Sequence, residues 1–381
     1  MRTILIIGSG FFGATVAERC ASRHGCRVIV LEKRDHAGGN SYSAPCPETG
    51  IEVHRHGSHI FHTHLPEVWD YVRQFAAFND YRHTVWTRLG DRIYPMPINL
   101  ATLNEFYGTA MSPDEARLRL AREIEATGIT SPRNLEEKAL SLIGRPLYEA
   151  FIRGYTIKQW GADPTQLPAD IITRLPVRFN YNLRYYNDPF QGIPLDGYGR
   201  LIARMLDHPA IDVRLAADYF DLRHTLPPHD RLVYTGAIDR YFDFAFGPLG
   251  WRSVRFDRRV LETDDFQGTS VLNRADAGVP FTRTHEFKHF TPERSFPGRT
   301  VVDHEYAGAS GPAEEPYYPM RTEDDLRRLA LYQAEAGRLA PRVLFGGRLG
   351  SYQYLDMDDA IAAGLACAEQ IGQTLPFGEQ S

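Results

Sequence analysis

The sequence predicts an α/β fold in which an open sheet domain is interrupted by a helical bundle and by an antiparallel β-sheet. Three observations support this fold class. A glycine-rich turn at 8–13 lies between an apolar run and a helical pattern, residues 99–183 have the apolar period of helices, and residues 281–288 alternate with period two. The pattern of the first segment returns near residue 343, so we expect the first domain to be discontinuous.

Three domains follow from these changes of pattern. We expect the first domain at 1–78, 196–243 and 321–381, the helical domain at 99–183, and the sheet domain at 79–98, 184–195 and 244–320. The length of 381 residues and the hydrophobic content of 43% suit two or three globular domains.

Capping signals place individual elements. Ser112-Pro113-Asp114-Glu115 predicts a helix start with a capping box and a proline at the first helical position. Asn134 predicts the start of another helix, which should end at Gly144. Thr300-Val301-Val302 reads as a strand, and a last helix is expected from about Met357 to Thr374.

The turn Gly8-Ser9-Gly10-Phe11-Phe12-Gly13 predicts a dinucleotide site. Gly8 allows the strand to turn tightly, Gly10 lets the backbone approach a pyrophosphate, and Gly13 lets helix and strand pack closely. Glu32 ends the next apolar run, where a carboxylate can accept hydrogen bonds from a ribose diol. The alternative is a glycine-rich loop that binds no ligand. The strand before the turn, the helix after it and the acidic residue at the expected spacing all argue against this alternative.

A second glycine pair distinguishes between the common dinucleotides. Ala37-Gly38-Gly39-Asn40 resembles the extended FAD signature of amine-oxidase-type flavoproteins, because a second backbone turn near the pyrophosphate helps to hold the long cofactor. We therefore expect FAD rather than NAD. The fold class becomes a discontinuous Rossmann-like FAD-binding domain with an inserted helical bundle and an antiparallel β-sheet domain.

The composition limits which binding partners and which cellular compartment we expect. The net charge of -5 gives no basic footprint for nucleic acid, and the apolar runs fall short of the roughly 20 residues of a membrane helix. Four cysteines without C-x-x-C spacing suit a reducing compartment, and the first strand leaves no room for a signal peptide. We expect a soluble, cytoplasmic protein that binds neither nucleic acid nor membrane.

Three motifs carry a more specific resemblance. Phe345-Gly346-Gly347-Arg348 through Asp358, Tyr155-Thr156-Ile157-Lys158-Gln159-Trp160, and Phe281-Thr282-Arg283 with Glu286 and Lys288-His289-Phe290 resemble bacterial UDP-galactopyranose mutase. The resemblance runs along the whole chain. It implies a homodimeric isomerase that interconverts UDP-galactopyranose and UDP-galactofuranose for cell-surface polysaccharide, with FAD that an external reductant keeps reduced. It also implies a covalent adduct between flavin N5 and the sugar, with no net redox change.

The glycine motif and the resemblance together give the expected cofactor contacts. They are Gly8, Gly10, Phe11, Phe12, Gly13, Glu32, Lys33, Gly39, Asn40, His59, Ile60, Gly347, Arg348, Asp356 and Met357. Asp356 reads as the N-cap of the last helix, with Asp359 as the capping-box acid. The amides of that helix would then stabilise the anion of reduced flavin.

Arg174 and Arg283 are the expected catalytic clamps on the substrate diphosphate, because a guanidinium fork matches phosphate oxygens. By resemblance, Arg174 lies on a mobile loop at about 161–178. The alternatives are a solvated loop arginine at 174 and an arginine at a sheet edge at 283. The other expected substrate contacts are His83, Phe151, Tyr155, Thr156, Trp160, Tyr185, Arg252, Asn273, Tyr317, Tyr318 and Tyr354. Which of Tyr317 and Tyr318 points inward stays open, because neighbours on a strand face opposite ways.

Five histidines between positions 54 and 64 permit three interpretations: a zinc site, simple polar packing, and a loop against the flavin. Zinc is disfavoured because no Asp, Glu or Cys stands nearby at the usual spacing. The resemblance places Gly57 to His62 beside flavin N5, with His62 as a catalytic residue, and we expect no metal.

Two other classes of function stay open. An amine-oxidase-like FAD oxidoreductase would oxidise its substrate and pass electrons to oxygen, and a non-catalytic module would bind the nucleotide sugar without turnover. The resemblance implies that the cofactor is the nucleophile. Consistent with this, the sequence shows no Ser-His-Asp signature, no H-E-x-x-H and no distinctive carboxylate pair.

Overall fold

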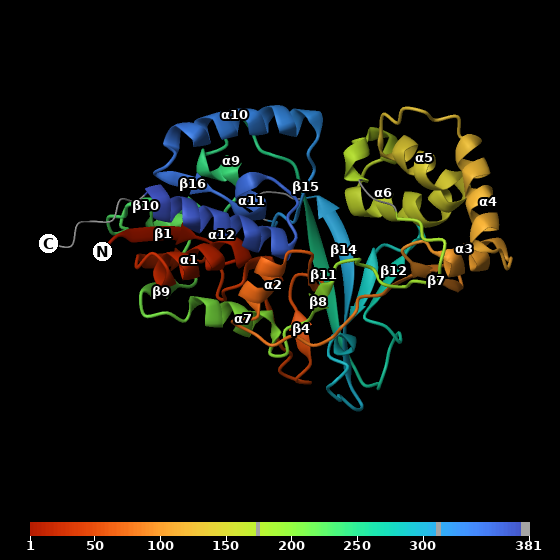
Figure 1. Ribbon diagram of the computed structural model, residues 1–381, viewed down its shortest axis with the longest axis horizontal. Helices are drawn as coiled ribbons and strands as arrows, with labels where there is room; N and C mark the ends of the chain where they lie inside the picture. The colour runs from red at the N-terminus through yellow and green to blue at the C-terminus, as the bar shows by residue number, and fades with distance from the viewer. Residues whose placement is uncertain (173–175, 310–313, 375–381) are drawn as a thin grey trace.

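A five-stranded parallel sheet forms the centre of the first domain (Figure 1). The computed structural model describes residues 1–172, 176–309 and 314–374. The strand order is β16 (Val343–Phe345), β10 (Arg231–Tyr234), β1 (Thr3–Ile7), β2 (Arg27–Leu31) and β9 (Ile211–Arg214). The strands come from three distant stretches of the chain, which confirms the discontinuous α/β fold class.

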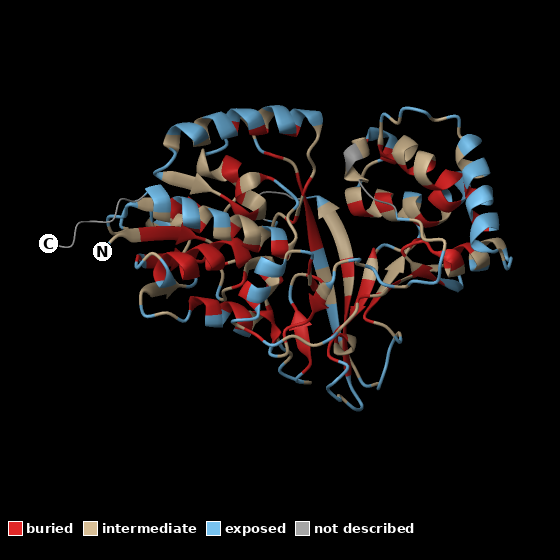
Figure 2. Ribbon diagram, in the orientation of Figure 1, coloured by how far each residue is buried: buried red, intermediate tan, exposed pale blue. Residues whose placement is uncertain are grey.

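Helices cover both faces of this sheet. On one face α1 (Phe11–Ser22) packs against α12 (Met357–Thr374) and α7 (Gly197–Leu206). These helices share a core with the buried strand residues Ile4, Ile6, Val28 and Val30. The remaining helices are α2 (Pro66–Val72), α8 (Tyr219–Leu222), α9 (Ile238–Tyr241), α10 (Glu323–Leu339) and α11 (Gly347–Ser351). Figure 2 shows β1 buried and the outer face of α10 exposed.

A seven-stranded sheet forms the second layer of the molecule. Its order is β15 (Tyr318–Pro319), β11 (Trp251–Leu261), β14 (Thr300–Ala309), β13 (Arg283–Glu286), β12 (Val271–Arg274), β6 (Val85–Leu89) and β7 (Arg92–Met96). All pairs are antiparallel except β12 with β6, which are parallel. The sheet is therefore mainly, not wholly, antiparallel.

The expected strand at 281–288 is shorter than the alternation predicts. It ends at Glu286 and continues as a 3-10 turn, η5 (Phe287–Phe290), which buries both Phe287 and Phe290. Burial of two aromatic rings on the same side requires this turn, since a strand would place them on opposite faces.

The helical domain lies at the right of Figure 1, with β11 and β14 between it and the first domain. It comprises α3 (Leu100–Tyr107), α4 (Pro113–Glu125), α5 (Leu135–Leu147), η2 (Tyr148–Arg153) and α6 (Gly154–Trp160). The Ser112 capping box and the Asn134 cap are present as predicted. The break expected at Gly144 is present, with a φ of 71°, but the helix resumes after it. None of the described helices is long and apolar enough to cross a membrane.

Short elements connect the three regions. Two small antiparallel pairs join β3 (Ser43–Pro45) to β4 (Glu52–His54) and β5 (Phe61–Thr63) to β8 (Phe190–Gly192). The 3-10 turns are η1 (Gly39–Ser41), η3 (Pro164–Gln166) and η4 (Ala169–Ile171). The last helix begins at Met357 and ends at Thr374, as predicted.

Candidate active site

A cavity of about 880 Å³ opens at the carboxyl ends of β1, β2, β10 and β16. This is where open parallel sheets bind their ligands. All of the expected cofactor residues except Ile60 line the cavity. Ile60 is buried and packs with Val85 and Phe287 in the core beneath the second sheet. Ile60 is thus not among the residues that line this cavity, and its contact with the cofactor stays a prediction.

The glycine turn shapes the floor of this cavity. A Cβ on Gly8 would stand 2.1 Å from Thr235 Oγ1, and one on Gly13 would stand 2.1 Å from the Gly8 carbonyl oxygen. Gly10 and Gly39 also approach closely, since a Cβ on Gly39 would lie 3.1 Å from the Gly10 Cα. No side chain caps the start of α1, so its first amides face an anion that enters the cavity.

Glu32 is buried beside the turn and is held by three donors. Its carboxylate accepts hydrogen bonds from Ser9 N (3.0 Å), Ser9 Oγ (2.7 Å) and Arg34 N (3.0 Å). These contacts fix the carboxylate at the end of β2, where a ribose diol would meet it. The roles of Ser9 and Arg34 were not predicted.

Glu315 closes the cavity from a distant part of the chain. Its carboxylate pairs with Lys33 Nζ at 2.9 Å and accepts a hydrogen bond from the Arg34 guanidinium. Burial raises the pKa of Glu315, but the hydrogen bonds and charges of Arg34 and Lys33 outweigh burial and lower the pKa to about 2. Sequence reasoning missed this residue because no local pattern links positions 33 and 315.

Residues near the C-terminus form one wall of the cavity. Through Arg348 and Tyr354 this wall lies next to a second group of residues, which surrounds Arg283. Arg348 lies on α11, donates to the Leu355 carbonyl at 2.6 Å, and lies 4.8 Å from the centre of the Tyr354 ring. The Asp356 N–H points to the Asp359 carboxylate at 3.4 Å, as a capping box requires. Burial raises the pKa of Asp356, although His62 and Arg348 oppose the rise.

Arg283 lies on β13 at the centre of the second group. Its Nε lies 3.3 Å from Glu305 Oε1, and its Nη2 donates to the Tyr155 hydroxyl. Burial lowers the pKa of Arg283, but the Glu305 carboxylate outweighs burial and raises the pKa well above its ordinary value. Burial likewise raises the pKa of Glu305, while Arg283 and His285 lower it to about 2. Arg283 is therefore a fixed cation, not a solvated surface charge.

Several phenols surround this cation. Burial raises the pKa values of Tyr155, Tyr318 and Tyr354, and the nearby charge of Arg283 opposes the rise. Tyr318 stacks on Tyr354 with ring centres 5.8 Å apart. Tyr317 faces away from this group, and its hydroxyl lies 2.7 Å from His56 Nδ1. The orientation left open by the sequence thus places Tyr318 on the Arg283 side.

Two of four further expected substrate contacts, Phe151 and Arg252, have structural partners. Phe151 is buried between Tyr94 and Phe106 in the helical core. The Arg252 Nε donates to the Gln159 carbonyl at 2.9 Å and so holds the end of α6. Thr156 is buried on α6, and Asn273 on β12 has a buried Oδ1 without a hydrogen-bond partner.

Three more of the predicted substrate residues are His83 and Tyr185, which lie in loops, and Trp160, which lies on α6. The backbone N–H of Tyr185 donates to the His83 carbonyl at 2.8 Å, and burial lowers the pKa of His83 to about 3. Trp160 is the last residue of α6 and is half-buried. Arg174 lies outside the described residues.

The five histidines do not converge on one point. His54 Nδ1 accepts from the His59 N–H at 3.0 Å, and His59 Nδ1 lies 2.6 Å from the Gly57 carbonyl. His62 Nδ1 lies 2.6 Å from Asp188 Oδ2, and its ring stacks on Tyr186 at 3.6 Å. Separate partners favour packing and a cavity loop over a shared zinc ion. Burial lowers the pKa of His59 to about 4, so its ring is neutral.

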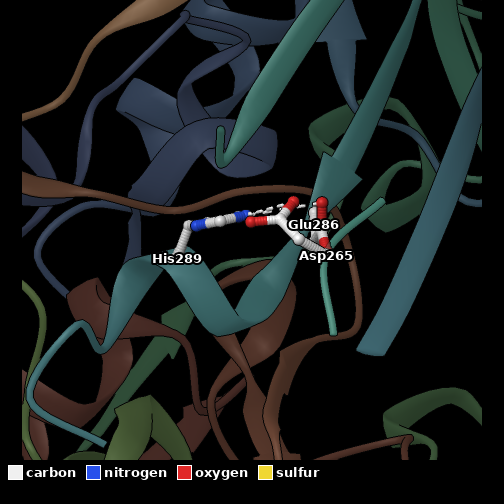
Figure 3. Close-up of side chains that lie close together, drawn as sticks. All are labelled: Asp265, Glu286 and His289. Carbon is white, nitrogen blue, oxygen red and sulfur yellow. Dashed lines mark ion pairs between the residues drawn. The ribbon is translucent and has the colours of Figure 1, made fainter. Parts of the chain in front are cut away.

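Asp265, Glu286 and His289 form the one group of three possible metal ligands in the described part of the chain (Figure 3). Glu286 is buried and accepts hydrogen bonds from Phe266 N, Gln267 N and Thr300 Oγ1. His289 Nε2 lies 3.4 Å from both carboxylates. The cluster is an ion pair that holds the loop after β11.

His289 should make stability depend on pH. Glu286 raises the pKa of His289, and burial opposes the rise. A raised folded pKa gives stability that is complete below about pH 6.5 and is lost as pH rises through the folded value. We expect His289→Gln to lower Tm by about 1–3 °C at pH 6 and to match the parent at pH 9. Equal losses at both pH values, measured by thermal melting, would contradict the ion pair.

Comparisons with known proteins agree with this geometry. Residues 150–354 match the family model of UDP-galactopyranose mutase, and residues 6–75 match an NAD(P)-binding Rossmann-like domain. A Klebsiella pneumoniae protein described as a probable UDP-galactopyranose mutase is 40% identical over 97% of this chain and 94% of its own. The dTDP-fucopyranose mutase of Escherichia coli is 39% identical over 97% and 98% of the two chains.

Solved structures share the fold. A crystal structure of reduced UDP-galactopyranose mutase has a TM-score of 0.75 at 17% identity and covers 97% of this chain and 95% of that chain. An oxidoreductase from Methanosarcina mazei has a TM-score of 0.54 at 14% identity and covers 88% and 83%. Together with the family model and the curated relatives, these findings show that the chain belongs to the UDP-galactopyranose mutase family, whose members are isomerases.

Proposed function

We propose that this protein interconverts UDP-galactopyranose and UDP-galactofuranose with reduced FAD as its cofactor. The observation that carries the proposal is Arg283, a cation paired with buried Glu305 and surrounded by tyrosines. Arg348 lines the dinucleotide cavity and contacts Tyr354, so the two sites adjoin. A diphosphate bound at Arg283 would hold the attached sugar beside the cofactor.

The cavity suits FAD in several respects. The close glycine turn and the uncapped start of α1 would take the pyrophosphate, and Glu32 would take a ribose diol. The start of α12 would lie at the flavin end, where its amides stabilise negative charge. Reduced flavin supplies a nucleophilic N5 for the anomeric carbon when it is bound. Purified protein should therefore carry a yellow chromophore.

The side chains have separate tasks in this proposal. Arg283 and the neighbouring phenols would neutralise and orient the diphosphate, both in the bound substrate and in the released UDP. Asp188 fixes the orientation of His62, whose Nε2 lies 4.0 Å from Asp356 Oδ2. His62 would thus hold or move a proton at Nε2 near the start of α12. Arg174 is proposed as the second clamp on the diphosphate.

A chromatographic assay tests the proposal. UDP-galactofuranose should convert to UDP-galactopyranose with dithionite-reduced enzyme and should remain unchanged with oxidised enzyme. Substrate-dependent bleaching of oxidised FAD would instead identify an oxidoreductase. Binding of UDP without turnover in the reduced state would identify a non-catalytic module.

One comparison supports a second candidate substrate. The dTDP-fucopyranose mutase of Escherichia coli is 39% identical to this chain, almost the identity of the Klebsiella pneumoniae relative at 40%. Both nucleotide sugars carry the diphosphate that Arg283 would bind. Parallel kcat/KM values for UDP-galactofuranose and dTDP-fucofuranose decide between them, and we propose the UDP sugar as the preferred substrate.

The remaining family expectations are also proposals. We propose a cytoplasmic homodimer that receives electrons from an external reductant. Light scattering on the purified holoenzyme tests the dimer.

A further inference from the structure

Five buried or half-buried side chains connect the cavity loop through Arg283 to Tyr155, by three hydrogen bonds and one ion pair. Ser58 Oγ lies 2.5 Å from His285 Nδ1, and His285 Nε2 lies 2.9 Å from Glu305 Oε2. Glu305 Oε1 lies 3.3 Å from Arg283 Nε, and Arg283 Nη2 donates to Tyr155. His285 and Glu305 are only 0% and 2% exposed, so water does not compete for these bonds. We call this series the Ser58–Tyr155 chain.

The ionised Glu305 carboxylate assigns the hydrogen bonds on both sides of His285 when the ring is neutral. Glu305 only accepts, so His285 Nε2 carries the proton that it donates. In the neutral ring, Nδ1 has a lone pair and accepts the hydroxyl hydrogen of Ser58. The Arg283 Nε forms an ion pair with Glu305, and its Nη2 donates to Tyr155. His285 is therefore the one member that accepts from the loop and donates toward the cation.

Strand register explains why these groups meet. On the antiparallel pair β13–β14, Arg283 stands opposite Glu305 and Thr284 stands opposite His304. Arg283 and His285 are two residues apart, so they share one face of the sheet, and Thr284 and His304 lie on the other face. Each face thus carries one histidine close to the same two strands, which supplies a natural control.

The loop end of the chain leads directly to the cofactor cavity. A Cβ on Gly57 would lie 3.6 Å from Glu305 Oε2 and 3.2 Å from the Phe256 ring, so the loop packs on the sheet. His59, the residue after Ser58, lines the cavity. A change at Ser58 would therefore move a wall of the cofactor site.

We propose that His285 is a positioning residue that sets the diphosphate-binding guanidinium of Arg283 through Glu305 and sets the cavity loop through Ser58. The proposal rests on the proposed function for the identity of the anion at Arg283. His285 is not among the residues that line the dinucleotide cavity, so it would act through Arg283 and Ser58. His285 thereby keeps two segments in a fixed relative position: the loop after β4 and the strand β13.

Two substitutions separate the ends of the chain. The amide of asparagine overlaps the Nδ1 position of histidine, so His285→Asn keeps the acceptor for Ser58 and loses the donor to Glu305. The amide of glutamine overlaps Nε2, so His285→Gln keeps the donor and loses the acceptor. The FAD holoenzyme of each variant is compared with the parent by titration with UDP and by the rate of FAD release.

His285→Asn should weaken UDP binding roughly tenfold, because a hydrogen bond to a carboxylate is lost, and should leave FAD release within about twofold. His285→Gln and Ser58→Ala should accelerate FAD release roughly fivefold and leave UDP binding within about twofold. His304→Gln, on the opposite face, should change neither quantity. A KM increase without a fall in kcat should accompany the weaker UDP binding of His285→Asn.

Equal effects of His285→Asn and His285→Gln on both quantities would reduce His285 to a structural residue and overturn the proposal. Parental values in both variants would overturn it as well. If neither His285 variant retains FAD, Ser58→Ala decides, and an unchanged rate of FAD release then overturns it. If the parent binds no UDP, the proposed function fails, whereas FAD release in Ser58→Ala and His285→Gln still tests the loop end of the chain.

Discussion

Replacement of Arg283 by alanine is expected to lower kcat/KM for the nucleotide sugar by about a thousandfold or more. The substitution removes the guanidinium that would meet the diphosphate, and it leaves the Glu305 carboxylate buried without its cation. Loss of one preorganised electrostatic contact to the transition state costs about 3–4 kcal/mol of activation free energy, and each 1.4 kcal/mol corresponds to about tenfold in rate. Initial rates with dithionite-reduced enzyme, followed by chromatography, measure the effect.

Two further variants separate charge from geometry. Arg283→Lys keeps the positive charge but loses the planar fork, and we expect an intermediate loss of about thirtyfold to a hundredfold. Arg259→Ala is the matched control, because Arg259 lies on β11, pairs with Asp257 and is 57% exposed. It should retain nearly full activity. Near-normal turnover in folded Arg283→Ala would remove this residue from the diphosphate site.

Features with local sequence signals were predictable. The glycine turn, Glu32, the Ser112 and Asn134 caps and the last helix each depend on residues a few positions apart. Such signals act within one turn or one strand, so the chain need not be folded for them to be read. Most residues that line the cavity at the end of the parallel sheet could accordingly be named from the sequence.

Features that depend on distant contacts were not predictable from residue patterns. Glu315 pairs with Lys33 and Arg34, which lie about 280 residues earlier in the chain. Glu305 on β14 pairs with Arg283 on the adjacent strand β13. Nothing near either glutamate in the sequence indicates a partner. The parallel pairing of β12 with β6 was missed for the same reason, because the two strands lie more than 180 residues apart in the chain.

Three expected site residues have packed surroundings for a common reason. Phe151, Ile60 and Arg252 lie next to functional segments in the sequence but point into packed surroundings. A motif identifies a segment, whereas the direction of each side chain depends on which face of the element is buried. The same principle resolves Tyr317 and Tyr318, whose neighbouring side chains lie on opposite faces.

The glycine turn gives the second large expected effect. Gly13→Ala should weaken FAD binding by roughly a hundredfold, so that the protein is purified largely colourless. The new Cβ would stand 2.1 Å from the Gly8 carbonyl oxygen and 3.1 Å from its carbon, both of them backbone atoms that no side-chain rotation can move. Helix α1 must therefore shift from β1, which costs about 1–3 kcal/mol and displaces the amides that face the pyrophosphate. The ratio of flavin absorbance to protein absorbance measures the occupancy.

Gly337→Ala is the matched control for this substitution. Gly337 lies in α10, and a Cβ there would meet no atom within 4 Å. Alanine favours the helix by about 1 kcal/mol relative to glycine, so this variant should be at least as stable as the parent and fully yellow. Because both variants add the same methyl group to a helical glycine, a difference between them reports the close approach at the turn. Full flavin occupancy in Gly13→Ala would mean that the cofactor does not depend on the contact between α1 and the end of β1, and the pyrophosphate would then have to bind elsewhere in the cavity.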